Sequence, residues 1–482
     1  MLLILLIAYM LVIRLILVFS YNLDADGAEF TFVHYIQKLL TGKQFYSNPT
    51  TYPYSTVLYT PLYLYIVFFI TKLLQLDYLT NIHEIYIVGR SVSFVCVLAS
   101  IYVVDLIIKK QQSNRLTRLL AVFVFLLIMS GHAFVLRPDG MKILFFLLYL
   151  HQFLNYFFYD KKIRNAVLLL LFAGLSFLSK QDVFVYILLF SFMHFLISKT
   201  KKSFLIVFML CFLFFLVSFF LKMIFGEYAF INLFNFNLQS ISNIKSSYNL
   251  LVVLFNSARF LPVLTILLFS FYKIRNENEM QLKLLIIAAF FSFCMTTFFL
   301  FRPGSFLNYT YESSILLMYA LFLIFNKYKY QFRLLLIIYF AVFFGSNLRI
   351  KNYRYFPSKE KKYKIEYHEF SVKKKQILPY IESHASIFTP QLQLGIFYAD
   401  LNIIYGHEYH LDRHIYSLLG IHTTSKLMLN KSTQFDEEFL IGNVKYILTY
   451  DKKEVNEVVK EFYLNYKLKQ KFDSTILYEF IK

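Results

Sequence analysis

The chain has 482 residues, of which 58% are hydrophobic and 16% are charged, and a single water-soluble core cannot bury that much apolar surface. The formal charge of +20 would suit nucleic-acid binding, but the Lys and Arg residues fall largely in short clusters between apolar runs, as they do in cytoplasmic loops. The composition therefore predicts a polytopic α-helical membrane protein, with the lipid bilayer and not nucleic acid as its partner.

The first apolar run, residues 2–20, resembles a signal peptide, yet no small-residue cleavage site separates it from the polar stretch LDADGAEF. We therefore expect an uncleaved first helix. The outer loop that follows, residues 21–56, carries Asp26 and Glu29, which lie one turn apart on one face if residues 26–40 are helical. Two carboxylates in this arrangement can bind a divalent metal or act as a general base, and a solvated helix cap is the alternative.

Eleven apolar runs of the sequence are predicted to cross the membrane. Seven are long enough to span alone, and four shorter ones fit inside a bundle. The long runs are 2–20, 86–108, 119–136, 141–159, 203–225, 283–301 and 333–349, and the shorter runs are 165–178, 183–198, 257–273 and 311–326.

A twelfth apolar stretch, residues 57–75, contains Pro61 and Lys72. The positive-inside bias places five basic clusters in the cytoplasm, which is possible only if this stretch does not cross. We therefore expect it to re-enter the membrane or to lie along the outer interface, as backbone hydrogen bonding allows where protein covers it. An odd number of crossings then places the C-terminus outside. The five clusters are Lys109, Lys110, Arg115 and Arg118; Lys161, Lys162 and Arg164; Lys199, Lys201 and Lys202; Lys273 and Arg275; and Lys327, Lys329 and Arg333.

Most of the remaining ionisable residues near the membrane lie in three later outer turns. One residue in each turn also has a purely structural explanation. Asp139 can be an N-cap, Lys180 an interfacial anchor, and Glu312 a carboxylate favoured by a helix dipole. Arg137 is a candidate phosphate ligand. The candidates are Arg137 and Asp139 in LRPDGMK, Lys180 and Gln181 in LSKQDVF, and Arg302, Asn308, Tyr309 and Glu312 in RPGSFLNYTYESS.

From about residue 351 the sequence mixes charged and apolar residues. Runs at 385–388, 446–449 and 475–480 predict strands, and residues 453–463 predict an amphipathic helix. We therefore divide the chain into a membrane module, 1–350, and a small extracytoplasmic α/β domain, 351–482. The tract GHEYHLDRH lacks the HExxH spacing of a zinc site, so we do not expect a metal there.

Taken together, these features resemble the GT-C glycosyltransferase superfamily, and most closely its bacterial family-39-like mannosyl and aminoarabinose transferases. The resemblance rests on the acidic first outer loop, the tract YPYSTVLYTPLYLY, the RPDG and LSKQD turns and the NYTYE helix start. It covers nearly the whole chain in layout, although each motif is short. One departure is the tract before Pro61, which reads Tyr59, Thr60, Pro61, Leu62 where relatives usually carry a charged residue followed by Pro-Pro-Leu.

The resemblance implies an enzyme of the bacterial inner membrane that takes a sugar from a polyprenyl-phosphate carrier and transfers it, with inversion, to an extracytoplasmic acceptor. It implies that Asp26 is the base and that Glu29 lies beside it. Asp139 matches the second acidic position, and Lys180 and Arg302 become the candidates for the carrier phosphate. A divalent metal held by Asp26, Glu29 and Asp139 is a further possibility.

Two other classes of membrane protein remain as the main alternatives, and a purely structural membrane scaffold is the least favoured one. A transporter or flippase for lipid-linked sugars is expected to place charges at mid-membrane and to contain broken helices or repeats, whereas the charges here lie mainly at helix ends. A polysaccharide polymerase or ligase shares the substrates, but it typically relies on a large later outer loop.

Overall fold

The fold is that of a computed structural model, which describes most of the membrane-embedded part and parts of the C-terminal region. The described residues are 1–23, 25, 29–47, 57–77, 81–111, 114–129, 133–235, 280–300, 307–327, 359–382, 385–389, 402–405, 442–450, 465–473 and 475–481.

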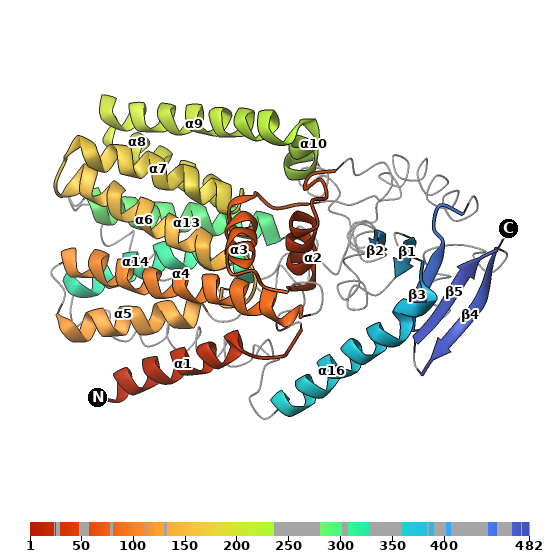
Figure 1. The fold of residues 1–482 in the computed structure, drawn as a ribbon. Helices are drawn as coiled ribbons and strands as arrows, with labels where there is room; N and C mark the ends of the chain where they lie inside the picture. The colour runs from red at the N-terminus through yellow and green to blue at the C-terminus, as the bar shows by residue number, and fades with distance from the viewer. Residues whose placement is uncertain are drawn as a thin grey trace.

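Long apolar helices lie side by side in a bundle (Figure 1). Among the described residues, four helices are long and apolar enough to cross a membrane by themselves, namely α4, α6, α9 and the segment Met280–Thr297 of α13. The bundle helices are α1 (Leu2–Val18), α4 (His83–Lys110), α5 (Arg115–Ile128), α6 (Asp139–Phe158), α7 (Ile163–Ser179), α8 (Val183–Ser198), α9 (Lys201–Phe225), α13 (Met280–Leu300) and α14 (Tyr311–Lys327).

These helices coincide with nine of the predicted crossings, counted within the described part of the chain. The runs 257–273 and 333–349 lie outside the described residues, so the total of eleven crossings stays a prediction. Helix α9 runs along one edge of the bundle (Figure 1), and it exposes a row of large apolar side chains that includes Phe208, Phe212 and Phe215. An exposed apolar face of this kind is expected where lipid covers a helix.

One predicted helix is wrong in its extent. The run 119–136 forms a helix only as far as Ile128, and residues 133–138 form a turn-rich segment inside the bundle. Ser130, Gly131 and His132 follow the helix in sequence, and such residues favour turns over helix interiors. Ala133, Phe134, Val135 and Leu136 are nevertheless buried. Their apolar character reflects packing against neighbouring helices in a loop and not a membrane crossing.

The stretch 57–75 forms α3 (Leu62–Leu73), which lies across the bundle and not along it (Figure 1). Helix α2 (Glu29–Leu40) lies beside it at the same end of the bundle. The short helix α10 (Glu227–Phe230) and the π-helical turn η1 (Ile231–Asn235) follow α9. The orientation of α3 agrees with the expectation that residues 57–75 do not cross the membrane.

The C-terminal region contains a five-stranded sheet in the order β2-β1-β3-β5-β4. Strand β1 pairs in parallel with β2 and β3, whereas β5 pairs antiparallel with β3 and β4. The strands predicted at 385–388, 446–449 and 475–480 are confirmed, and the helix predicted at 453–463 lies outside the described residues. The strands are β1 (Ser386–Thr389), β2 (Asn402–Tyr405), β3 (Tyr446–Thr449), β4 (Tyr466–Phe472) and β5 (Thr475–Phe480).

Helix α16 (Glu360–Ile377) connects the bundle to this sheet (Figure 1), and the 3-10 turn η4 (Leu378–Tyr380) follows it. The Ser20 hydroxyl and the Tyr21 amide, just after α1, donate hydrogen bonds to the Glu360 carboxylate at 2.7 and 3.0 Å. The Tyr367 hydroxyl donates to Asn81 Oδ1 at 3.1 Å. These contacts tie α16 to the end of the bundle where α1 ends and α4 begins.

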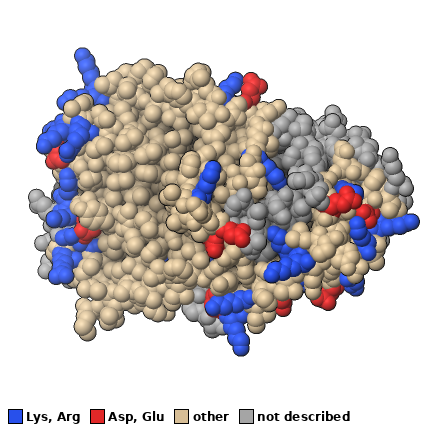
Figure 2. Space-filling model, in the orientation of Figure 1, with Lys and Arg blue, Asp and Glu red and all other residues tan. Residues whose placement is uncertain are grey.

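The opposite end of the bundle is basic. In Figure 2 one group of Lys and Arg side chains lies at the end of the bundle farthest from the sheet, and a second group lies on the side of α16 and the sheet. Lys109 and Lys110 end α4 at the end farthest from the sheet, and Arg115 begins α5. Under the positive-inside bias this is the cytoplasmic end, so the sheet and α16 lie at the end expected to be extracytoplasmic.

Candidate functional site

Six charged side chains from three later segments meet at the sheet-proximal end of the bundle, and all but the partly exposed Asp182 are buried. Asp139 begins α6, and its carboxylate lies 3.1 Å from Arg137 Nε and 2.9 Å from Lys180 Nζ. Lys142, one turn further along α6, lies 2.8 Å from Glu312 and 3.3 Å from Asp182. We call this group, Arg137, Asp139, Lys142, Lys180, Asp182 and Glu312, the ion cluster.

Helix ends explain why these residues sit together. Asp139 lies in the first turn of α6, Asp182 is the N-cap of α8, and Glu312 lies in the first turn of α14. Carboxylates are favoured at helix N-termini because the peptide dipoles place partial positive charge there. The three acids in turn stabilise the cations, and all of these charges would be costly in the apolar bundle without partners.

The cluster has an outer and an inner part. The side chains of Lys142, Glu312 and Asp139 have 0% exposure, whereas Asp182 retains 11% and Lys180 4%. Asp182 of the α7–α8 turn is therefore the member nearest to solvent, and Arg137, at 5%, is about as exposed as Lys180. Burial works to lower the pKa of Lys180, but attraction from the Asp139 and Asp182 carboxylates outweighs it and raises the pKa above its ordinary value. Lys180 consequently stays cationic.

Two tyrosines lie near the Lys180 ammonium. Its Nζ atom lies 4.8 Å from the ring centre of Tyr309 and 6.0 Å from that of Tyr59. The Gln181 side chain donates a hydrogen bond to the Leu58 carbonyl at 2.7 Å, which ties residues 58–59 to the α7–α8 turn. The tract that departs from the GT-C pattern thus lies at the site and contributes an aromatic ring.

The cluster also contains unsatisfied acceptors. Among the described residues, Asp182 Oδ1, Glu312 Oε2 and the neighbouring Gln181 Oε1 are buried without a hydrogen-bond partner. Buried acceptors of this kind are costly unless a ligand or water satisfies them. Hydroxyl groups of a bound molecule are suitable donors.

Glu29 lies outside this cluster and is held by a different cation. Its carboxylate accepts two hydrogen bonds from Arg90, Nε to Oε1 at 2.8 Å and Nη2 to Oε2 at 2.6 Å, and both side chains have 0% exposure. It also accepts from the amides of Ala25 and Leu136 at 2.9 and 2.8 Å. Arg90 donates in addition to the Ser20 carbonyl at 2.8 Å. The pair clamps the chain after α1, the start of α2 and the 133–138 segment onto α4.

The structure brings together only some of the predicted site residues. Arg137, Asp139, Lys180, Gln181, Tyr309 and Glu312 lie in or beside the ion cluster. Glu29 is instead paired with Arg90, and Glu312 lies on the inner side against Lys142. Asp26, Arg302 and the tract GHEYHLDRH lie outside the described residues; Asn308 lies in the 3-10 turn η2 (Leu307–Thr310).

The described acids do not fit the metal site that the sequence suggested. Glu29 is engaged by Arg90, and Asp139 by Arg137 and Lys180. Within the described ranges, no group of three His, Cys, Asp or Glu side chains is placed to hold a metal ion. A carboxylate that is already paired with cations is a poor metal ligand.

Sequence reasoning missed Lys142 and Arg90. Both lie inside runs that were interpreted simply as apolar spans, 141–159 and 86–108. An ionisable residue within a spanning segment is a functional candidate by default because burying it alone is costly. Lys142 also follows Asp139 at the i+3 spacing of helix neighbours. The burial of a charge in a spanning run and the spacing from Asp139 were together sufficient to predict Lys142 as a site residue.

Close packing at Gly140 holds the start of α6 against α4. A Cβ atom at Gly140 would lie 2.7 Å from the Ala133 carbonyl oxygen and 3.1 Å from that of Ser93. We expect Gly140→Ala to cost about 1–3 kcal/mol, as overpacking typically does, because backbone atoms cannot swing aside. Gly174→Ala is the matched control, since its nearest atom would be Leu213 Cδ2 at 3.6 Å. Thermal unfolding in detergent tests both, and equal stability of the two variants would contradict this account of the packing.

No protein-family model and no curated protein matches the sequence, but solved structures share its fold. The archaeal oligosaccharyltransferase AglB from Archaeoglobus fulgidus, in complex with an inhibitory peptide and a dolichol-phosphate, matches with a TM-score of 0.53 and 11% identity over 93% of this chain and 69% of that chain. The Archaeoglobus fulgidus oligosaccharyltransferase in complex with Zn and sulfate matches with a TM-score of 0.50 and 13% identity over 92% of this chain and 67% of that chain.

At these identities the similarity concerns the fold. Oligosaccharyltransferases of this kind have the GT-C fold, and the apolar helices of the bundle require a bilayer. The chain is an integral membrane protein with a GT-C fold.

Proposed function

We propose that the chain is a membrane glycosyltransferase that moves a sugar from a polyprenyl-phosphate carrier to an extracytoplasmic acceptor. The observation that carries the proposal is the ion cluster, which gathers Arg137, Lys142 and Lys180 with three carboxylates at the end of the bundle opposite the basic clusters. The GT-C fold and the dolichol-phosphate of the AglB complex support a lipid-phosphate donor.

The chemistry of the carrier fits this position. A polyprenyl tail stays in the bilayer, so its phosphate has to be met at the interface by cations fixed on helix ends. Lys180 and Arg137 are the cations that keep some exposure, and Arg302 is proposed as a further phosphate ligand on the basis of the sequence. Tyr309 and Asn308 are proposed to line the donor site. Hydroxyl groups of the donor sugar would satisfy Oδ1 of Asp182, the most exposed member of the cluster.

The proposed reaction is a single displacement with inversion. Asp26 removes the proton from an acceptor hydroxyl while the acceptor oxygen forms a bond to the anomeric carbon of the sugar. The bond between that carbon and the phosphate oxygen breaks, and its electron pair leaves on the carrier phosphate. Lys180 and Arg137 stabilise the charge that develops on the phosphate. Glu29 and Asp139 assist by holding Arg90 and Lys180 in place.

We further propose, from the sequence motifs, that the enzyme is similar to the family-39-like mannosyl and aminoarabinose transferases and is located in a bacterial inner membrane.

The decisive experiment incubates purified protein with polyprenyl-phosphate-linked hexoses, pentoses and aminopentoses and measures release of polyprenyl phosphate. Release from at least one donor is expected. A flippase would move these lipids between leaflets without cleaving them, so translocation without release from any donor contradicts the proposal.

We expect Asp26→Asn to abolish transfer, because an amide cannot accept the acceptor proton. Expression and thermal stability in detergent should stay at wild-type levels. Asp160→Asn is the control, since this half-exposed carboxylate follows the end of α6 that is remote from the cluster and pairs with Lys110 at 3.6 Å. Full activity of Asp26→Asn would refute its role as the base.

A further inference from the structure

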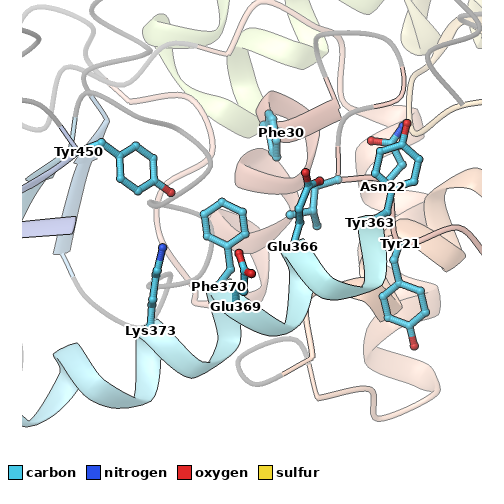
Figure 3. Close-up of a pocket in the computed structure, with 10 residues that line it drawn as sticks. Tyr21, Asn22, Phe30, Tyr363, Glu366, Glu369, Phe370, Lys373 and Tyr450 are labelled. Atoms are coloured by element: carbon cyan, nitrogen blue, oxygen red, sulfur yellow. The ribbon is translucent and has the colours of Figure 1, made fainter. Parts of the chain in front are cut away.

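A cavity of about 450 Å³ lies between the bundle and the C-terminal region. One wall is a single face of α16, formed by Tyr363, Glu366, Phe370 and Lys373, which recur at the three- and four-residue spacing of helix neighbours. The opposite wall includes Phe30 of α2. In Figure 3 the Glu366 carboxylate points toward Phe30 and Asn22 at one end of the cavity, while Lys373 and Tyr450 point toward one another at the other.

The topology of the sheet points to the same place independently. Strand β2 lies on one side of β1 and β3 lies on the other, and all three strands are parallel. The chain therefore reverses its winding direction at β1. Ligands of open parallel sheets bind outside the carboxyl ends of the strands where the winding direction reverses. Tyr450, which follows the last residue of β3, lies at that edge and lines the cavity.

The lining combines aromatic faces with carboxylates. Phe30, Phe370 and Tyr450 offer flat apolar surfaces, and Glu366 and Glu369 offer hydrogen-bond acceptors. The Lys373 ammonium lies 5.9 Å from the centre of the Tyr450 ring and supplies a donor. Saccharides present apolar C–H faces together with rings of hydroxyl groups, so they match this mixture. The volume falls within the range of small-molecule sites, roughly 300–1,000 Å³.

The cavity is also placed to work with the ion cluster. Phe30 lines the cavity, whereas Phe32, two residues further along α2, lies 5.7 Å from the Arg137 guanidinium. Residues two apart on a helix face roughly opposite directions, so α2 runs between the two sites. Leu23 and Phe30 also flank, in sequence, the stretch that contains Asp26.

We propose that this cavity binds the acceptor and that the acceptor is a saccharide, which deepens the proposed function and rests on it. The aromatic rings hold the sugar face, and Glu366 and Glu369 accept hydrogen bonds from its hydroxyls. A saccharide held there has to present one further hydroxyl toward the start of α2. A basic peptide is the competing occupant, because Glu366 and Glu369 also suit cations.

The absence of tryptophan from the sequence allows a local binding assay. Phe370→Trp and Tyr450→Trp each place a single fluorophore in one wall of the cavity, and Leu468→Trp on the exposed face of β4 is the matched control. Each folded variant is titrated, without donor, with glucose, mannose, galactose, N-acetylglucosamine and their disaccharides, and with tetralysine.

We expect at least one saccharide to give a saturable emission change in a cavity reporter and none in the Leu468→Trp control. Adding Glu366→Gln to the responding reporter should weaken that binding about tenfold, as the loss of a hydrogen bond to a charged group does. Silence of both cavity reporters toward every saccharide, or a response to tetralysine alone, overturns the proposal. The binding assay contains no donor, so its result is independent of donor cleavage. Donor cleavage without saccharide binding would contradict the acceptor proposal alone, and saccharide binding without donor cleavage would contradict the proposed function.

Discussion

The Lys180→Met variant is expected to turn over its lipid-linked donor about 10²–10³-fold more slowly than the wild type, the usual cost of removing one group that stabilises developing negative charge. Lys180 is the ammonium nearest to solvent in the ion cluster, and it lies 2.9 Å from Asp139 and 3.6 Å from Asp182. Methionine preserves the apolar stem but cannot meet a phosphate. The fold should survive, since Asp139 keeps its contacts with Arg137 and Lys142.

The control for Lys180→Met is at the other end of the same helix. Lys162 is the N-cap of α7, whereas Lys180 is its C-cap, and Lys162 is exposed at the basic end of the bundle. Lys162→Met should leave turnover unchanged. Rates of polyprenyl-phosphate release at saturating donor compare the two variants. If both variants matched the wild type, Lys180 would have no role in stabilising the phosphate.

The second large effect concerns stability. Arg90→Met should destabilise the bundle by about 3–5 kcal/mol, because it leaves the fully buried Glu29 carboxylate without its cation. Arg90 also donates to the carbonyls of Ser20 and Asn22, so the connection between α1 and α2 loses its anchor. Replacing both partners, as in Arg90→Met with Glu29→Leu, should recover part of the loss. The recovery is partial since the amides of Ala25 and Leu136 lose their acceptor.

Thermal unfolding in detergent measures these changes in stability. The ion pair between Arg118 of α5 and Asp105 of α4 offers the control. Arg118 makes a similar two-pronged contact with Asp105 of α4 at the opposite end of the bundle, but there each side chain is 29% exposed. Arg118→Met should have a much smaller effect, because water replaces the lost contact. An equal loss of stability in Arg90→Met and Arg118→Met would show that burial does not make the Arg90–Glu29 pair more important for stability than an exposed pair.

The fold was largely predictable because long apolar runs have few alternatives in a bilayer. Helices α4, α6, α8 and α9 begin and end within a few residues of the predicted runs. The failure at 119–136 has a physical cause: hydropathy reports burial, and residues 133–136 are buried in a loop. Hydropathy alone cannot distinguish a loop inside the bundle from a helix in lipid. The strands β2 and β4 were missed, and β4 is hard to detect because Lys occupies three of its seven positions.

The site was predictable in part, for a related reason. Residues at helix starts, such as Asp139 and Glu312, are visible as charges that border apolar runs. Their partners are set by tertiary packing, which a sequence pattern does not contain. Glu29 was therefore grouped with Asp26 by helical spacing, whereas the fold pairs it with Arg90, 61 residues away. Lys142 was overlooked because one charge changes the hydropathy of a long run very little.

The ion cluster is proposed to bind the phosphate of a lipid carrier, and direct binding of that lipid tests this role. Native mass spectrometry of the purified protein, with polyprenyl phosphate and the matching polyprenol at equal concentrations, reports which lipid is retained. The wild type is expected to retain the phosphate form over the alcohol, and Lys180→Met is expected to lose that preference. Equal retention of the two lipids by the wild type would contradict this role.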